Sequence, residues 1–209
     1  DQFTSRTAEF GNDLSTLPDF PAEIRAPAGT LPGVSAFQLH FADHEIMTPG
    51  DSPNVLVAMN PAALKANIKD LPRGADLILN TDEFTTRNLS KVGYESSPLE
   101  DGTLDSFRVH PIALTSLTVE ALKDFDIGKK EAERAKNMFA LGMLSWLYHR
   151  PTEATIEFLG NKFGRTPEIL AANIAAFEAD APWFYRREGN IGLFERLAAA
   201  WRAFRSPRG

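Results

Sequence analysis

The spacing of apolar residues predicts a set of β-strands in the first half of this chain. Residues 36–41 alternate apolar and polar side chains, as a half-buried strand does. Residues 54–59 form a continuous apolar run instead, which is typical of a strand covered on both faces in a parallel sheet. Residues 76–80 predict a further buried strand, and residues 107–114 predict another strand.

Helices are predicted between these strands. Asn60 and Pro61 indicate a helix start, because an asparagine cap satisfies free amides and a proline presets the first helical backbone angle. That helix extends over 62–71, and two later helices are predicted over 81–89, capped by Thr81, and from a Thr115 cap to residue 123. Alternating strands and helices predict right-handed crossovers and a three-layer α/β domain with a mostly parallel sheet.

Helices are also predicted at both ends of this α/β region. Apolar residues at helical spacing predict a helix over 3–14 that ends before Pro18 and Pro21, and the later part of the chain predicts helices over 131–149, 152–163 and 167–179. The expected fold is therefore a three-layer α/β domain with added C-terminal helices. Because the chain opens inside a predicted helix, we expect that the first strand and its Gly-rich turn are missing.

Composition narrows the possible chemistry. Of 209 residues, 43% are hydrophobic and 24% are charged, which is typical of a folded globular chain. The absence of cysteine excludes disulfides, thiolate-held zinc, a cysteine nucleophile and a self-contained iron–sulfur cluster. No apolar stretch approaches the ~20 residues needed to span a bilayer, and no signal segment is visible. We therefore expect a cytoplasmic protein without a membrane interaction.

Charge is distributed unevenly along the chain. The formal net charge is −6, but residues 186–209 carry six Arg and two Glu, so the preceding body is more acidic than the total suggests. An acidic body repels phosphate backbones and disfavours nucleic-acid binding. For the tail, three interpretations stay open: a docked terminal helix over 192–205, a basic amphipathic helix for an anionic surface, or out-of-frame, non-native sequence.

Known catalytic motifs are missing from the sequence. It contains no Gly-x-Ser-x-Gly elbow, no Walker loop and no complete Gly-x-Gly-x-x-Gly after a strand. His40, His44, His110 and His149 do not show the spacing of a zinc site on a helix. We therefore predict no catalytic residue and no metal ligand within this chain.

Two segments are candidate binding positions. Glu23 and Arg25 lie between two prolines in a connection that leads into a strand, where α/β folds place ligand loops. A structural ion pair between them is the alternative interpretation. Asn60 follows a strand and precedes a helix, where free amides favour an anion. The alternative for Asn60 is a plain helix cap.

Three motifs in order resemble one enzyme family. These are Pro-Ala-Glu-Ile-Arg over 21–25, Val-Leu-Val-Ala-Met-Asn-Pro-Ala-Ala over 55–63, and Lys-Asn-Met-Phe-Ala-Leu-Gly over 136–142. In order and spacing they resemble the gamma subunit or gamma domain of the 2-oxoacid:ferredoxin oxidoreductases, most closely the 2-oxoglutarate type. The resemblance covers residues 1–180 and implies that they form one gamma-type, Rossmann-like α/β domain. It leaves 181–209 as an arginine-rich tail, native or not.

The resemblance implies a function as part of a larger enzyme. Members of this family decarboxylate a 2-oxoacid on thiamine diphosphate with Mg²⁺, pass electrons through iron–sulfur clusters to ferredoxin, and release an acyl-CoA. It implies alpha and beta subunits or domains as partners, and an isolated chain that is inactive. It also implies a supporting role for Glu23, Arg25 and Asn60 near the coenzyme A side.

The sequence departs from the family pattern in the loop after Arg25. Many members continue with Gly-Gly, whereas this chain continues with Ala26 and Pro27. Two other hypotheses therefore stay open. The chain could be a stand-alone α/β module that binds a small anionic ligand through Asn60 and the Pro/Gly loop, or a purely structural interaction domain.

Overall fold

The computed structural model describes residues 13–19, 34, 36–42, 45, 52–148 and 150–179. The chain divides into two compact units, which are described separately below. We call residues 11–113 the sheet unit, and Leu114–Gly209 together with Asp1–Phe10 the helical unit. Glu23, Arg25, residues 3–12 of the first predicted helix and the tail from residue 180 lie outside the described residues.

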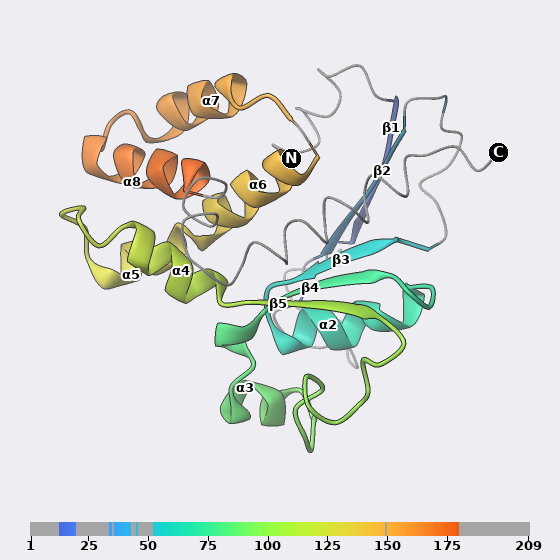
Figure 1. Ribbon diagram of the computed structural model, residues 1–209. Helices are drawn as coiled ribbons and strands as arrows, with labels where there is room; N and C mark the ends of the chain where they lie inside the picture. The colour runs from blue at the N-terminus through green and yellow to red at the C-terminus, as the bar shows by residue number, and fades with distance from the viewer. Residues whose placement is uncertain are drawn as a thin grey trace. The chain divides into compact units, whose positions relative to one another are not determined.

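Three parallel strands form the centre of the sheet unit (Figure 1). They are β3 (Val55–Ala58), β4 (Asp76–Asn80) and β5 (Arg108–Ile112), in the spatial order β3-β4-β5. All five residues of the central strand β4 are buried, as its continuous apolar run predicted. The α/β class, the parallel sheet and the C-terminal helices are thus confirmed.

Short helices connect these strands. They are α2 (Pro61–Asn67) with the 3₁₀ turn η1 (Ile68–Asp70), and η2 (Thr81–Glu83) with α3 (Thr86–Lys91). Leu77 and Leu79 of β4 share a core with buried residues from these segments, among them Leu64, Leu71, Phe84 and Leu89. One face of the sheet is therefore sealed by α2, α3 and the turns around them (Figure 1).

The sheet unit also contains an antiparallel hairpin of β1 (Asp13–Asp19) and β2 (Ala36–Ala42). Strand β2 was predicted, but the residues of β1 were expected to end a helix and to contain its stop signal. Asp13 pairs with Ala42 and Asp19 with Ala36, so backbone pairing with β2 overrides the helical spacing. Proline is compatible with this arrangement because it occurs on edge strands.

Two further boundaries were wrong by a few residues. The predicted helix over 81–89 is a 3₁₀ turn followed by α3, whose cap is Thr85, because the Thr85 hydroxyl accepts a hydrogen bond from Asn88 N at 3.3 Å. Thr115 is not a cap either, since α4 (Leu114–Ala121) begins one residue earlier with the fully buried Leu114.

The helical unit continues with four more helices. They are α5 (Lys129–Arg134), α6 (Lys136–Leu147), α7 (Glu153–Phe163) and α8 (Pro167–Glu178). One helix was predicted over 131–149, but it is divided at Ala135, whose N–H bonds to the carbonyls of both Glu131 and Ala132. Leu122 packs with buried alanines from three places: α5, the start of α6, and α8. Because these side chains are small, the helices lie close together.

Gly142 allows the closest of these approaches. A Cβ at this position of α6 would collide with the backbone carbonyl of Phe177 in α8, which is a rigid group. Phe177 is 1% exposed and Met143, next to the glycine, is also 1% exposed. The glycine that ends the 136–142 motif is therefore required where α6 passes α8.

We expect Gly142→Ala to lower the free energy of unfolding by about 1–3 kcal/mol, because the added methyl group forces the two helices apart. Gly160→Ala in α7 is the matched control, since a Cβ there meets nothing within 4 Å. The control should raise stability by about 0.5–1 kcal/mol through better helix propensity. Urea unfolding followed by circular dichroism measures both, and equal effects of the two substitutions would contradict the close approach.

Candidate functional site

Asn60 lies just beyond the carboxyl end of β3, where α/β sheets place ligands. Its backbone is extended, with φ −160° and ψ 167°, and its Oδ1 accepts a hydrogen bond from Ala63 N at 2.8 Å. Pro61 is the first residue of α2. The predicted asparagine cap followed by proline is confirmed, and this cap occupies the Asn60 oxygen.

Asn80 is a second asparagine at the same edge of the sheet, and the sequence analysis gave it no role. It ends β4, is fully buried, and its Nδ2 lies 3.5 Å from the carbonyl oxygen of Met59, the residue before Asn60. Asn80 thus links the carboxyl ends of β3 and β4 next to the α2 cap. A polar amide ending an apolar strand was the available sequence signal.

Lys65 fixes α2 against the segment that follows α3. Its Nζ donates hydrogen bonds to the carbonyls of Val92 at 2.5 Å and Gly93 at 3.1 Å, and lies 5.0 Å from the centre of the Tyr94 ring. These carbonyls end α3, where a cation is favourable. Lys65 therefore links α2 to the end of α3, in addition to the buried contact of Leu64 with the core.

The strongest polar cluster lies at the opposite, amino edge of the sheet. Asp76 begins β4 and accepts two hydrogen bonds from the Arg108 guanidinium. Its Oδ1 lies 2.9 Å from Arg108 Nε, and its Oδ2 lies 2.6 Å from Arg108 Nη2. Nε2 of His110, on β5, lies 2.8 Å from Asp76 Oδ1. Asp76 and His110 are 8% and 7% exposed, whereas the Arg108 side chain is 57% exposed.

The Asp76 carboxyl is held in its charged form by these partners. Burial raises its pKa, but hydrogen bonds and charge from Arg108 and His110 together outweigh burial and leave the pKa below its ordinary value. The carboxylate accepts, so His110 Nε2 donates. Since Asp76 pairs directly with Arg108 in the β4–β5 register, the cluster fixes that register and is a structural feature.

Asp76→Asn should lower the free energy of unfolding by about 1.5–3 kcal/mol at neutral pH, because charge-assisted hydrogen bonds are lost. A carboxyl whose pKa is lower in the folded than in the unfolded state stabilises the fold at pH values above its unfolded pKa, about 3.9. This contribution is lost as the pH falls through the folded pKa. The difference between wild type and variant should therefore shrink below about pH 4.

Unfolding curves in urea between pH 7 and pH 3 measure this dependence. Asp70→Asn is the matched control, because Asp70 is exposed in the same unit, and it should stay within about 0.5 kcal/mol of wild type. A constant difference across the whole pH range would show that Asp76 does not carry the charge.

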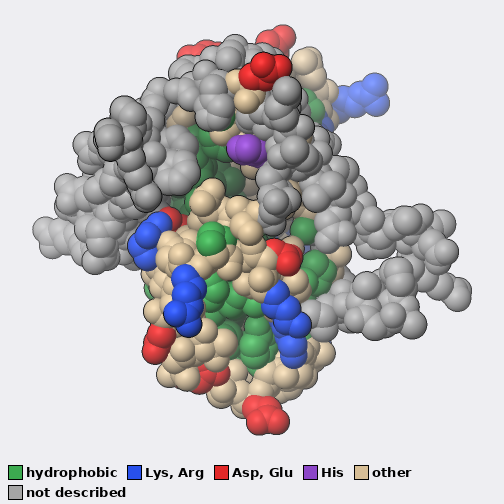
Figure 2. Space-filling model, turned by 90° about the vertical axis from the view of Figure 1, so that its right-hand side faces the viewer, with side chains coloured by type: hydrophobic (Ala, Val, Ile, Leu, Met, Phe, Trp, Pro, Cys, Tyr) green, Lys and Arg blue, Asp and Glu red, His purple; other side chains and the backbone are tan. Residues whose placement is uncertain are grey.

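Metal-binding clusters and membrane-spanning helices are not found among the described residues. Among them, no three His, Cys, Asp or Glu side chains are placed to hold a metal ion. No helix in the same part of the chain has the length and apolar character needed to cross a membrane. On the face displayed in Figure 2, described acidic and basic side chains are interspersed rather than gathered by sign.

Comparison with known proteins shows the family. Residues 3–180 match the pyruvate ferredoxin/flavodoxin oxidoreductase family. The chain is 59% identical over 185 residues to the 2-oxoglutarate oxidoreductase subunit KorA of Mycobacterium tuberculosis, covering 88% of this chain and 28% of that one. Since the match extends over most of its length, this chain belongs to the pyruvate ferredoxin/flavodoxin oxidoreductase family, and the resemblance stated from its motifs is confirmed.

A solved structure shares the fold. The 2-oxoglutarate:ferredoxin oxidoreductase from Magnetococcus marinus, solved with 2-oxoglutarate, coenzyme A and succinyl-CoA bound, superposes with a TM-score of 0.57 at 23% identity. The match covers 95% of this chain and 28% of that one. This chain therefore spans little more than a quarter of the length of both relatives.

Proposed function

We propose that this chain is the gamma-type part of a cytoplasmic 2-oxoacid:ferredoxin oxidoreductase that acts on 2-oxoglutarate. The complete enzyme would oxidatively decarboxylate the 2-oxoacid, release an acyl-CoA and reduce ferredoxin. The observation that carries the proposal is the 59% identity over 185 residues to subunit KorA. The three motifs of the sequence analysis fall inside the residues matched by the family.

Under this proposal the redox chemistry belongs to other parts of the enzyme. Iron–sulfur clusters need cysteine thiolates, and this chain has none. Thiamine diphosphate, Mg²⁺ and the clusters would be held by alpha and beta subunits or domains.

The experiment that tests the function compares the chain with the assembled enzyme. Purified chain is mixed with 2-oxoglutarate, coenzyme A and a viologen acceptor, with and without the alpha and beta parts. We expect turnover only in the complete mixture, because this chain lacks the electron carriers. Turnover by the chain alone, or equal turnover by the other parts without it, would overturn the proposal.

Asn60 is proposed to support the coenzyme A side together with Glu23 and Arg25. The position supports this role, since Asn60 lies at the carboxyl edge of a parallel sheet and its cap orders the start of α2. A role limited to capping would affect only stability. Three substitutions at this position separate stability from ligand binding.

We expect Asn60→Ala to lower the free energy of unfolding by about 1 kcal/mol, whereas Asn60→Ser and Asn60→Asp keep the cap and the stability. Asn60→Asp adds a negative charge, so it should raise the KM for coenzyme A by about threefold or more, while Asn60→Ser leaves KM near wild type. The assembled enzyme is assayed with varied coenzyme A. An unchanged KM in Asn60→Asp would leave Asn60 as a cap alone and remove it from the proposed site.

Two other functions give different results in these measurements. A stand-alone module for a small anion would bind coenzyme A or a nucleotide tightly without partners, which calorimetry detects. A structural interaction domain would show weaker assembly in Glu23→Ala and Arg25→Ala, with unchanged turnover of the complexes that do form. The oxidoreductase proposal expects neither tight binding by the chain alone nor unchanged turnover.

A further inference from the structure

The helical unit contains a cavity of about 310 Å³ between α5, α6, α7 and α8. This volume lies at the lower end of the range for small-molecule sites, which favours a ligand of about ten non-hydrogen atoms. Ala135 and Ala172, each 2% exposed, form part of its wall. Both alanines also pack with Leu122 in the core of the unit.

Most of the remaining wall is apolar. Ile127, Met138, Phe163 and Ile169 line the cavity and are only half-buried, so their surfaces stay partly open to it. Ile127 and Met138 also pack against the core of the unit, which holds them in place. A wall of this kind gains free energy by covering an aliphatic body.

Charged side chains in the wall leave one positive charge in excess. Arg134 pairs with Glu131 at 2.5 Å, so these two groups neutralise each other. Lys162 is in no ion pair of the described residues, and its Nζ lies 5.3 Å from the Phe163 ring centre and 5.6 Å from that of Phe158. Lys162 is exposed, so it presents a solvated positive charge at the rim of the cavity.

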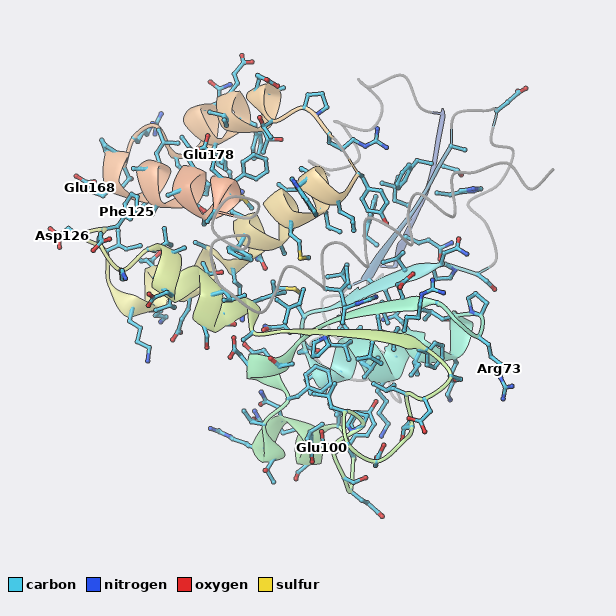
Figure 3. All side chains as sticks on the ribbon, viewed as in Figure 1. Arg73, Glu100, Phe125, Asp126, Glu168 and Glu178 are labelled. Carbon is cyan, nitrogen blue, oxygen red and sulfur yellow. The ribbon has the colours of Figure 1, made fainter. Side chains whose placement is uncertain are left out.

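The start of α8 borders the cavity, and the Glu168 carboxylate in its first turn offsets the partial positive charge of the helix start. Thr166 makes no side-chain capping bond to the first turn, and Ile169 and Asn173 of α8 line the cavity. The nearby carboxylates of Asp126 and Glu168 are exposed, point outward from the unit in Figure 3, and do not line the cavity.

We propose that this cavity binds a small monoanion with an aliphatic body, such as a medium-chain carboxylate. Its carboxylate lies near Lys162 and the guanidinium of Arg134, and its chain lies against the apolar wall. One unpaired cation matches a monoanion better than a doubly charged phosphate. This site is independent of the function proposed above, since it rests on the helical unit alone.

The test uses the full 209-residue chain and two probes of equal length, sodium octanoate and octylammonium chloride. Binding is followed by the NMR shifts of the Asn137 and Asn173 side-chain amides, both of which line the cavity. We expect saturable shifts with octanoate and about tenfold weaker binding of octylammonium, because only the head group differs. Equal or tighter binding of octylammonium would overturn the proposal.

Two substitutions locate the charge. Lys162→Gln should weaken octanoate binding about fivefold or more and leave octylammonium binding no weaker. Lys130→Gln is the matched control, because Lys130 is exposed in the same unit and does not line the cavity, and its effect should stay below about twofold. Circular dichroism confirms that both variants fold.

Arg134→Gln provides a second variant should Lys162→Gln unfold, and it should also weaken octanoate binding. Three results would overturn the proposal: no saturable shift up to about 10 mM octanoate, shifts that avoid the cavity amides, or equal effects of the Lys162 and Lys130 substitutions. A saturable octanoate shift that is lost in Lys162→Gln and kept in Lys130→Gln supports it.

Discussion

The sheet unit depends on a single strand that is buried along its whole length. Each of the five residues of β4 is covered, so its backbone must pair with strands on both sides and its polar ends must find partners. Asp76 meets Arg108 and His110 at one end, and Asn80 reaches the Met59 carbonyl at the other. Polar contacts at the two ends therefore fix the register of the apolar strand between them.

This arrangement separates structure from candidate function within one sheet. The amino edge holds a charged cluster that links β4 to β5, while the carboxyl edge holds the Asn60 cap and the start of α2. Ligands in α/β folds approach the carboxyl edge. The cluster with the strongest electrostatics thus lies at the edge opposite the proposed site.

Sequence reasoning succeeded where one local signal determined the structure. The apolar run of β4 and the cap at Asn60 were predicted because burial on both faces and a free helix start each restrict the residues that fit. The hairpin strand β1 was missed, since pairing between residues 13 and 42 is a long-range contact that no local spacing reports. The Asp76 cluster was missed for the same reason, because its residues lie 32 and 34 positions apart.

The glycine of α6 has a consequence for how this part of the chain can vary in length. Its contact with Phe177 in α8 fixes the number of residues between the division at Ala135 and the point where the two backbones meet. One residue inserted between them would rotate the glycine by about 100° around the axis and place a side chain at the crossing. Length changes are accommodated only outside this stretch, for example in the connection between α6 and α7.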